Sequence, residues 1–213
     1  MTRLILIRHG ESSANQNRIF AGNYDAELAE NGFIQAKATA KYIKENYKID
    51  KIYSSNLKRA YATANEVASL LGLEITVCEN MREISAGKWE GIKFEEIVKS
   101  YPDDFDVWLK NIGASRCTDG ESVCELGQRV MTALTEIAKS NDGKTVVIST
   151  HATPIRVSQC IIEHGTLDKM TDVPWVSNAS LTIYRYDNGE WNIEAVSLDS
   201  HLEGYKTVLP ANV

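Results

Sequence analysis

Two apolar runs, each followed by a histidine, constrain the fold of this chain more than any other feature. Residues 2–7 and 145–148 are rich in leucine, isoleucine and valine, which succeed one another instead of alternating with polar residues. Continuous runs of this length are typical of strands that are covered on both faces of a parallel sheet. His9 and His151 follow the two runs closely. The pattern therefore predicts an α/β fold in which two strands deliver histidines to one edge of a sheet.

The remainder of the chain repeats the order strand, loop, helix. Residues 51–54 favour a second buried strand, and Asp187-Asn188-Gly189 separates two strand-like runs in the manner of a hairpin. Ser122 and Glu125 have the spacing of a capping box at the start of a helix. Apolar residues recur at helical spacing in four segments, which are residues 32–47, 57–71, 122–137 and 153–164. We expect a three-layer α/β/α sandwich with a mainly parallel sheet.

The length of the chain bears on its domain organisation. At roughly 150 residues per domain, 213 residues favour a single domain over residues 1–213. Residues 79–120 are less regular, with a proline, several glycines and two short helical patterns. We expect this segment to be an insertion that lies over the active site. Core packing, rather than pocket lining, is the expected role of three tryptophans, Trp89, Trp108 and Trp175.

Composition excludes several classes of partner. The formal net charge is -6, so nucleic acid or an anionic membrane could be bound only through a local basic patch, and we expect neither. No apolar stretch approaches the roughly 18 residues of a membrane helix, which favours a cytoplasmic protein. The four cysteines lack CxxC spacing, so we expect reduced thiols and no metal site. A homodimer is left open by the sequence.

Polar residues that follow the predicted strands describe an anion pocket. Arg8 and His9 follow the first strand, Arg59 follows the second, and His151 follows a third. In parallel α/β folds, ligands bind beyond the carboxyl ends of the strands, so these side chains should meet. Guanidinium groups match phosphate oxygens in pairs, and a neutral imidazole nitrogen can act as a nucleophile. The sequence thus predicts a phosphate site in which one histidine attacks while the other binds.

These residues lie within a series of motifs that resembles the histidine phosphatase superfamily, which has the phosphoglycerate-mutase-like fold. The resemblance extends over nearly the whole chain. Its motifs, in order, are Leu6-Ile7-Arg8-His9-Gly10-Glu11-Ser12 with Asn15, then Gly22, Asp25, Leu28 and Gly32, then Ser54-Ser55-Asn56-Leu57-Lys58-Arg59-Ala60 with Thr63-Ala64, then Arg82-Glu83, Gly87-Lys88-Trp89-Glu90-Gly91, Gly120-Glu121-Ser122 and the strand that ends at His151.

The resemblance implies an activity and a role for each site residue. It implies a metal-independent phosphatase that hydrolyses a small phosphorylated metabolite through a phosphohistidine, without a cofactor. His9 would be the nucleophile, and Glu83 would give a proton to the leaving oxygen. The phosphoryl oxygens would be bound by Arg8, Asn15, Arg59 and His151, and the loop at Ala21 and Gly22 would lie close to the substrate.

Departures from the family pattern bear on the alternatives. In the mutases of the family a tyrosine follows the glutamate by three residues and paired arginines lie in the insertion, whereas this chain has Ala86 and, beside Cys117, only Arg116. These differences favour hydrolysis over a phosphoglycerate mutase, an isomerase, which stays an alternative. A weakly catalytic phosphate-binding module is a further alternative, because Ala152 stands where the family usually has glycine after its second histidine.

Overall fold

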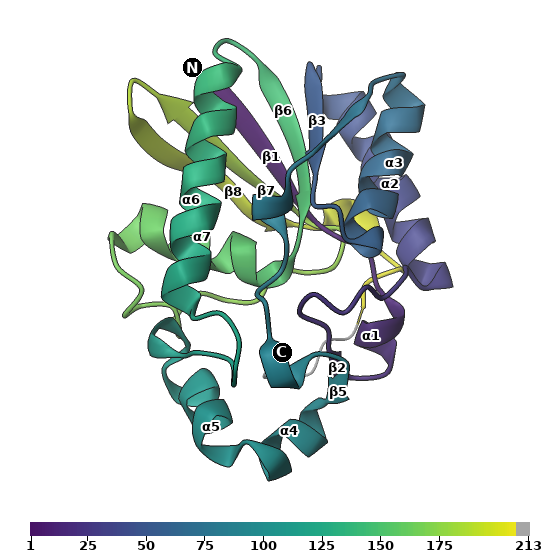
Figure 1. Ribbon diagram of the computed structural model, residues 1–213. Coiled ribbons are helices and arrows are strands. Elements are labelled where there is room, and N and C mark those ends of the chain that lie inside the picture. The colour runs from purple at the N-terminus through teal and green to yellow at the C-terminus, as the bar shows by residue number, and fades with distance from the viewer. Residues whose placement is uncertain (208–213) are drawn as a thin grey trace.

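The computed structural model describes residues 1–207 and shows a six-stranded sheet between two layers of helices (Figure 1). The strand order is β4-β3-β6-β1-β7-β8, so that β1 lies inside the sheet. Four strands pair in parallel, β1 (Thr2–Arg8), β3 (Lys51–Ser54), β4 (Ile75–Val77) and β6 (Thr145–Thr150). An antiparallel hairpin completes the sheet beside β1 and consists of β7 (Leu181–Asp187) and β8 (Glu190–Leu198).

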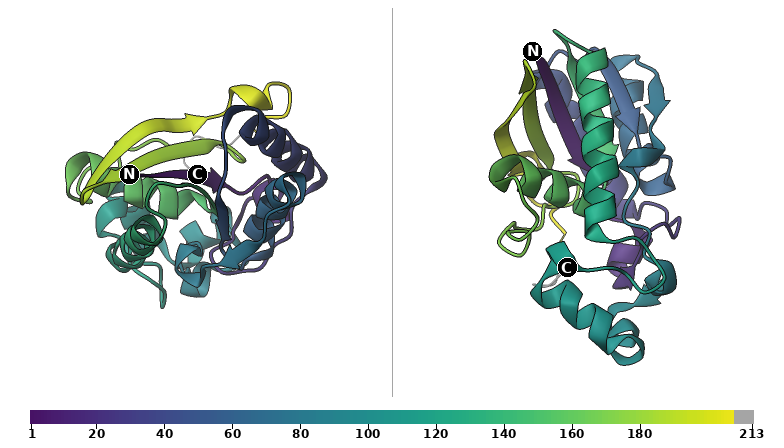
Figure 2. Two further views of the ribbon diagram at one scale, coloured as in Figure 1. Left: turned by 90° about the horizontal axis from the view of Figure 1, so that it is seen from above. Right: turned by 60° about the vertical axis from the view of Figure 1, so that its left-hand side comes forward.

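Helices cover both faces of the sheet, as the continuous apolar strands require. Successive side chains of β1 point to opposite faces, so Leu4 and Leu6 pack in one core cluster while Ile5 and Ile7 pack in the other. All four are fully buried. The isoleucine side is covered by α2 (Glu30–Asn46) and α3 (Lys58–Leu71), and the leucine side by α6 (Val123–Ser140) and α7 (Ala152–His164) (Figures 1 and 2).

Short elements gather at the end of the molecule toward which the parallel strands run (Figure 1). They are α1 (Ser13–Gln16), β2 (Ile19–Phe20), β5 (Ile92–Lys93), α4 (Phe94–Ser100) and α5 (Pro102–Lys110), with 3-10 turns at Glu79–Met81, Gly87–Trp89 and Ile112–Ala114. A fourth 3-10 turn, Ser200–Leu202, follows β8. The strands β2 and β5 pair with each other and so tie the first loop of the chain to the irregular segment.

The predicted α/β architecture with a mainly parallel sheet is confirmed. The capping box at Ser122 and Glu125 begins α6, while α2 and α7 begin one or two residues earlier than their apolar patterns do. All four cysteines are free. None of the helices in the described part of the chain is long and apolar enough to cross a membrane. The single domain over residues 1–213, with an insertion at residues 79–120, stays a prediction.

Candidate active site

A pocket opens beyond the carboxyl ends of β1 and β6. It holds about 590 Å³ of space, its open mouth included. Its lining comes from segments far apart in the sequence and consists of Arg8, His9, Ser12, Asn15, Ile19, Phe20, Ala21, Gly22, Arg59, Glu83, Phe94, Trp108, Ala152, Thr153 and Trp175. Every predicted site residue except His151 is among these side chains.

His9 presents an uncharged nitrogen to the pocket. Its ring is 4% exposed, and Nδ1 lies 2.7 Å from the backbone oxygen of Gly10. Since a carbonyl oxygen can only accept, Nδ1 carries the proton and Nε2 carries the lone pair. Arg59 Nε donates to this Nε2 at 3.2 Å. Burial, with the positive charges of Arg59 and Arg8, holds the pKa of His9 well below its usual range. The ring is therefore neutral at neutral pH.

Two buried arginines give the pocket fixed positive charge. Arg8 Nη1 donates to the backbone oxygen of Val176 at 2.5 Å, and Arg8 Nε has no partner among the described residues. Arg59 Nη1 and Nη2 donate to the backbone oxygens of Tyr24 and Gly22 at 2.9 and 2.7 Å. Burial lowers the pKa of each guanidinium to about 10, so both stay protonated at neutral pH. Such a pair suits an anion with several oxygens.

His151 packs against His9 but does not line the pocket. The two rings meet edge to face, with centroids 5.2 Å apart. His151 Nε2 lies 2.9 Å from Ser55 Oγ, and within residues 1–207 its buried Nδ1 has no partner. Burial, followed by the charge of Arg59, lowers the pKa of His151 well below its usual range. Direct binding of phosphoryl oxygens by His151 stays a prediction.

We expect these two buried histidines to make the protein less stable in mild acid. Below pH 6.5 the unfolded chain binds protons at both rings and the folded chain does not, so the free energy of unfolding falls as pH falls. From pH 7.5 to 5.5 each ring can contribute a loss of at most about 1.4 kcal/mol, the limit that an unfolded pKa of about 6.5 sets. Urea unfolding at the two pH values measures this loss. A His151→Asn variant should lose less stability than wild type over that interval, and an equal loss would contradict the lowered pKa of His151.

The carboxyl group of Glu83 is oriented by two backbone amides. Its Oε1 accepts from the amide of Ile84 at 2.8 Å, and its Oε2 accepts from that of Thr153 at 3.3 Å. Thr153 belongs to the first turn of α7, where unpaired amides carry partial positive charge. The carboxyl group is thereby fixed in the pocket wall between the irregular segment and α7.

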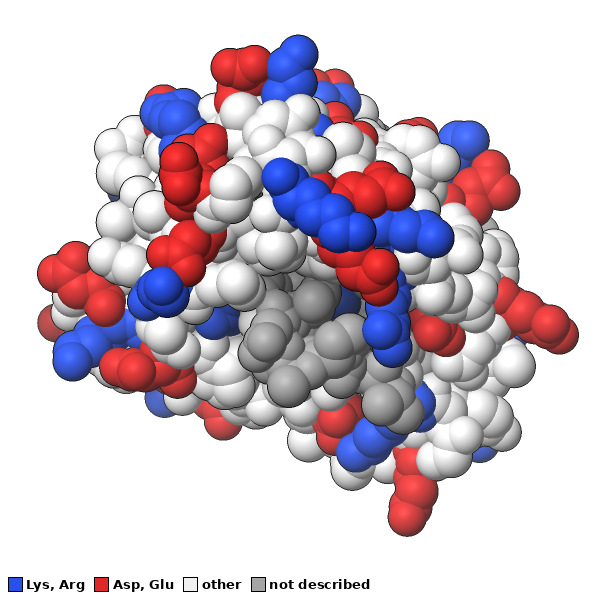
Figure 3. All heavy atoms as spheres, turned by 90° about the horizontal axis from the view of Figure 1, so that it is seen from below, with Lys and Arg blue, Asp and Glu red and all other residues white. Residues whose placement is uncertain are grey.

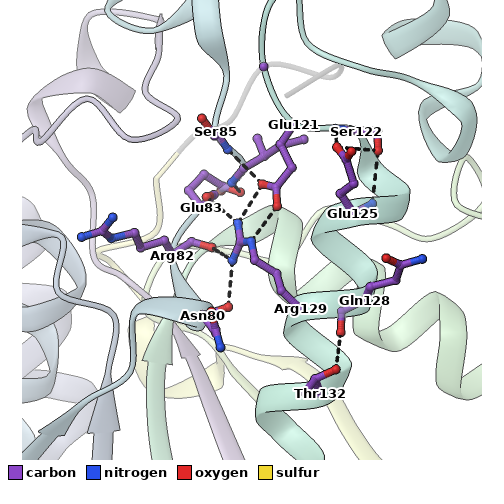
Figure 4. Close-up of polar contacts among 12 residues, drawn as sticks. Asn80, Arg82, Glu83, Ser85, Glu121, Ser122, Glu125, Gln128, Arg129 and Thr132 are labelled. Carbon is purple, nitrogen blue, oxygen red and sulfur yellow. Dashed lines mark hydrogen bonds and ion pairs between the residues drawn. The ribbon is translucent and has the colours of Figure 1, made fainter.

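An ion pair between Arg129 and Glu121 fixes the backbone on either side of Glu83 (Figure 4). Arg129 of α6 pairs with Glu121 through Nε and Nη2 at 2.7 and 2.9 Å. The same guanidinium donates to the backbone oxygens of Asn80, Arg82 and Glu83 at 2.7, 3.0 and 2.9 Å. Glu121 also accepts from the amide of Ser85 at 3.1 Å. Arg129 and Glu121, which we call the Arg129 clamp, therefore fix both ends of the loop around Glu83.

Asn15 is fixed by a network that the sequence did not reveal. Its Oδ1 accepts from the backbone and hydroxyl groups of Ser12, at 3.0 and 2.9 Å, and from Asn178 Nδ2 at 3.3 Å. The same Asn178 amide donates to the backbone oxygen of His9 at 3.0 Å. Asn178 thus ties Asn15 to His9, and the Nδ2 group of Asn15 is the part of that amide left for a ligand.

The loop at Ala21 and Gly22 closes one side of the pocket. Gly22 has a φ of +50°, and a Cβ there would lie 2.7 Å from the Cβ of Ala86. Glycine is therefore required both by its backbone conformation and by the space. Both residues of this loop line the pocket with the other predicted site residues, and their contact with a substrate stays a prediction.

The three tryptophans pack in or against the core, as expected, and two of them also line the pocket. Trp89 is fully buried and does not line the pocket, in agreement with expectation. Trp108 is 4% exposed yet lines the pocket, and so does the less buried Trp175. Ala152, the first residue of α7, is also part of the wall, and its φ is not positive, so the extra methyl group causes no backbone strain.

Charge near the pocket is confined to a few side chains. Among the described lining residues, the positive charges are those of Arg8 and Arg59. On the end of the molecule drawn in Figure 3, Lys and Arg side chains are interspersed with Asp and Glu rather than gathered in one patch. Residues 1–207 contain no group of three or more His, Cys, Asp or Glu side chains placed to hold a metal ion.

Comparisons with known proteins agree with this geometry. The model of the histidine phosphatase superfamily (branch 1) matches residues 4–199. Phosphoserine phosphatase 1 of Hydrogenobacter thermophilus is 34% identical over 95% of each chain. The structure of Bacillus stearothermophilus YhfR superposes with a TM-score of 0.90 at 31% identity, over 95% of this chain and all of that one. A mutant phosphoserine phosphatase of Entamoeba histolytica in complex with phosphoserine superposes with a TM-score of 0.83 at 30% identity, over the same shares. This chain belongs to the histidine phosphatase superfamily.

Proposed function

We propose that this protein hydrolyses small phosphomonoesters through a phosphohistidine formed at His9, without a metal ion. The observation that supports this most is the neutral Nε2 of His9 beside two charged guanidinium groups. A neutral imidazole can attack phosphorus, and the arginines stabilise the charge on the phosphoryl oxygens as the transition state develops. A cytoplasmic location and a homodimer stay predictions.

In the first half of the reaction, the lone pair on Nε2 of His9 forms a bond to phosphorus. The bond from phosphorus to the ester oxygen breaks, and the carboxyl group of Glu83 gives its proton to that oxygen. The proton on Nδ1 stays hydrogen-bonded to the oxygen of Gly10, which stabilises the positive charge on the phosphorylated ring. Arg59 Nε must exchange its hydrogen bond to Nε2 for one to a phosphoryl oxygen.

In the second half, the carboxylate of Glu83 takes a proton from water as the water oxygen bonds to phosphorus. The bond from Nε2 to phosphorus breaks, inorganic phosphate leaves, and His9 regains its lone pair. The proton returned to Glu83 restores the starting state, so each turnover consumes one ester and one water.

Phosphate release in the presence of a chelator tests the proposal. We expect steady hydrolysis of 4-nitrophenyl phosphate and propyl phosphate in excess EDTA, and an acid-labile phosphoprotein when the reaction with labelled ester is quenched in base. Turnover that required an added divalent cation would contradict the proposal. Tight binding of phosphate with neither turnover nor a trapped adduct would favour the phosphate-binding module instead.

One observation supports hydrolysis over mutase chemistry. Ala86 stands where mutases of the family have tyrosine, and it is fully buried, with its Cβ close to the backbone of Gly22. The described lining offers the cations Arg8 and Arg59 for one phosphoryl group, without a second cationic pair for another anionic end. With 3-phosphoglycerate we expect phosphate to form faster than 2-phosphoglycerate, and the reverse order of rates would favour the mutase.

The Arg129 clamp should affect turnover through the position of Glu83. We expect Arg129→Ala to lower kcat for propyl phosphate by roughly 10²-fold, because a displacement of about 1 Å in a catalytic group can have an effect of that size. The KM should change much less, since Arg8 and Arg59 are untouched. Steady-state kinetics with propyl and 4-nitrophenyl phosphate measures both constants.

The control for the clamp is a nearby arginine in an exposed ion pair. Arg116 pairs with Glu125 at 2.8 Å, and both side chains are more than half exposed. Such pairs contribute little, so Arg116→Ala should stay within about twofold of wild type. If Arg129→Ala lowered thermal stability but left kcat for both esters unchanged, the clamp would be structural only.

A further inference from the structure

The lining of the pocket divides into a polar set and an apolar set. The polar set surrounds His9 and includes the groups assigned above to the phosphoryl transfer. The apolar set is supplied by β2, α4, α5, the start of α7 and the loop before β7, and consists of Ile19, Phe20, Phe94, Trp108, Ala152 and Trp175. A phosphate ester that places its phosphoryl group at His9 has its alcohol portion left to contact this second set.

Three of the apolar side chains form one aromatic group. The ring of Phe20 lies 5.5 Å from that of Phe94 and meets that of Trp108 edge to face at 5.2 Å. The β2–β5 pairing places Phe20 opposite Ile92, so the ring from the first loop is held in register with the irregular segment. Such contacts are favoured geometries for aromatic pairs, and all three rings line the pocket.

The ring of Trp175 stacks against a buried cation, Arg156. The guanidinium carbon of Arg156 lies 3.9 Å from the centroid of the Trp175 ring. Arg156 Nε donates to the backbone oxygen of Val173 at 3.0 Å, and its Nη2 donates to that of Met170 at 2.9 Å. Arg156 is 3% exposed and is not a lining residue, so its guanidinium group supports the indole from outside the pocket lining.

The described lining residues include no further cation that could pair with a second negative charge on the ligand. Arg8 and Arg59 are the cationic side chains of the lining, and the phosphoryl group requires both. A carboxylate on the alcohol portion would therefore lie against aromatic rings and near Glu83, where its desolvation is uncompensated. Phosphoserine carries such a carboxylate.

We infer that the alcohol portion of the substrate is uncharged and carries an apolar, preferably aromatic, group that packs between Trp175 and the Phe20–Phe94–Trp108 cluster. This inference rests on the proposed function. It assigns specificity to the apolar walls and distinguishes this chain from relatives that are named for phosphoserine.

Esters that share a leaving oxygen test the inference. Propyl phosphate and 3-phenylpropyl phosphate are both esters of primary alcohols, so a difference in kcat/KM reports recognition of the ring and not reactivity. We expect the phenylpropyl ester to be preferred by about tenfold or more, and phosphoserine to be a poorer substrate than either. The non-hydrolysable propyl- and 3-phenylpropylphosphonates should show the same order of inhibition constants.

Variants in the two walls test the assignment. Trp175→Ala and Phe94→Ala should each remove most of the preference for the phenylpropyl ester, measured in each variant as the ratio of kcat/KM for the phenylpropyl ester to kcat/KM for propyl phosphate. Trp191→Ala is the matched control, because Trp191 is a partly buried tryptophan of β8 outside the pocket. This control should keep the preference.

The outcomes separate the two proposals. Hydrolysis of none of the esters would overturn the proposed function. Hydrolysis with phosphoserine preferred, or with equal constants for the propyl and phenylpropyl esters, would overturn this inference and leave the phosphatase in place. A preference that survived both wall substitutions would also overturn it.

Discussion

Replacement of His9 by alanine is expected to lower kcat by roughly 10⁴-fold or more for every phosphate ester, because it removes the atom that accepts the phosphoryl group. The remaining charges of Arg8 and Arg59 can still bind the dianion but cannot split the reaction into two steps. Rapid quenching with labelled substrate should yield no acid-labile phosphoprotein. Steady-state phosphate release and the quench measure the two effects separately.

The control for His9 is a partly buried imidazole that lies outside the pocket. His201 lies 3.0 Å from Thr39 Oγ1 and stacks on Tyr42, and it does not line the pocket. His201→Asn should therefore keep the phosphoprotein and most of the turnover. In His9→Ala, inorganic phosphate should still raise the thermal stability, which shows that the anion site has survived. Turnover by His9→Ala at the wild-type rate would exclude the phosphohistidine mechanism.

The part of the site that the sequence predicted best depends on the topology of the sheet. Leu4 to Ile7 favour a strand buried on both faces, and in parallel sheets the carboxyl ends of such strands meet at one edge. This rule alone predicts that Arg8, His9 and Arg59 lie close together. In the structure all three line the same pocket, and their roles in the reaction stay predictions.

Glu83 illustrates what local pattern alone cannot predict. It lies in an irregular segment where no period indicates the direction of a side chain, so only the resemblance to the family singled it out. In the structure, its carboxyl group is oriented by Thr153 of another element and its backbone by Arg129 of a third. Asn178 was missed for the same reason. These roles arise from contacts between distant segments, which composition and spacing do not record.

The small sheet of β2 and β5 shows the same limit on the fold. A two-residue strand has no alternation to detect, yet the pairing of Phe20 with Ile92 brings the aromatic wall of the pocket together. Trp108 and Trp175 pack in or against the core as expected, but the sequence could not show that they also line the pocket. A large aromatic residue in a pocket wall has the same sequence pattern as one in a core. Burial and pocket lining coincide at Trp108.

Substitution of Glu83 by glutamine is expected to have an effect that depends on the leaving group. A positioned acid contributes about 10²- to 10⁴-fold, so kcat/KM for propyl phosphate should fall by roughly 10³-fold, because an alkoxide leaves poorly without a proton. For 4-nitrophenyl phosphate the fall should be less than about tenfold, since nitrophenolate leaves without one. Glutamine keeps one acceptor oxygen for these amides, and Arg129 still binds the backbone oxygen of residue 83, so the loop should keep its position.

The second half of the reaction gives the same variant an independent signature. The ratio kcat/KM reports the steps through phosphorylation, whereas kcat includes hydrolysis of the phosphohistidine, which also requires the carboxylate of Glu83 as a base. With 4-nitrophenyl phosphate, Glu83→Gln should therefore show a burst of nitrophenolate close to one per active site, followed by slow turnover. Glu11→Gln is the matched control, because Glu11 accepts from Asn31 Nδ2 at 2.8 Å and does not line the pocket. An equal loss of kcat/KM for both esters, without a burst, would mean that Glu83 transfers no proton in either step.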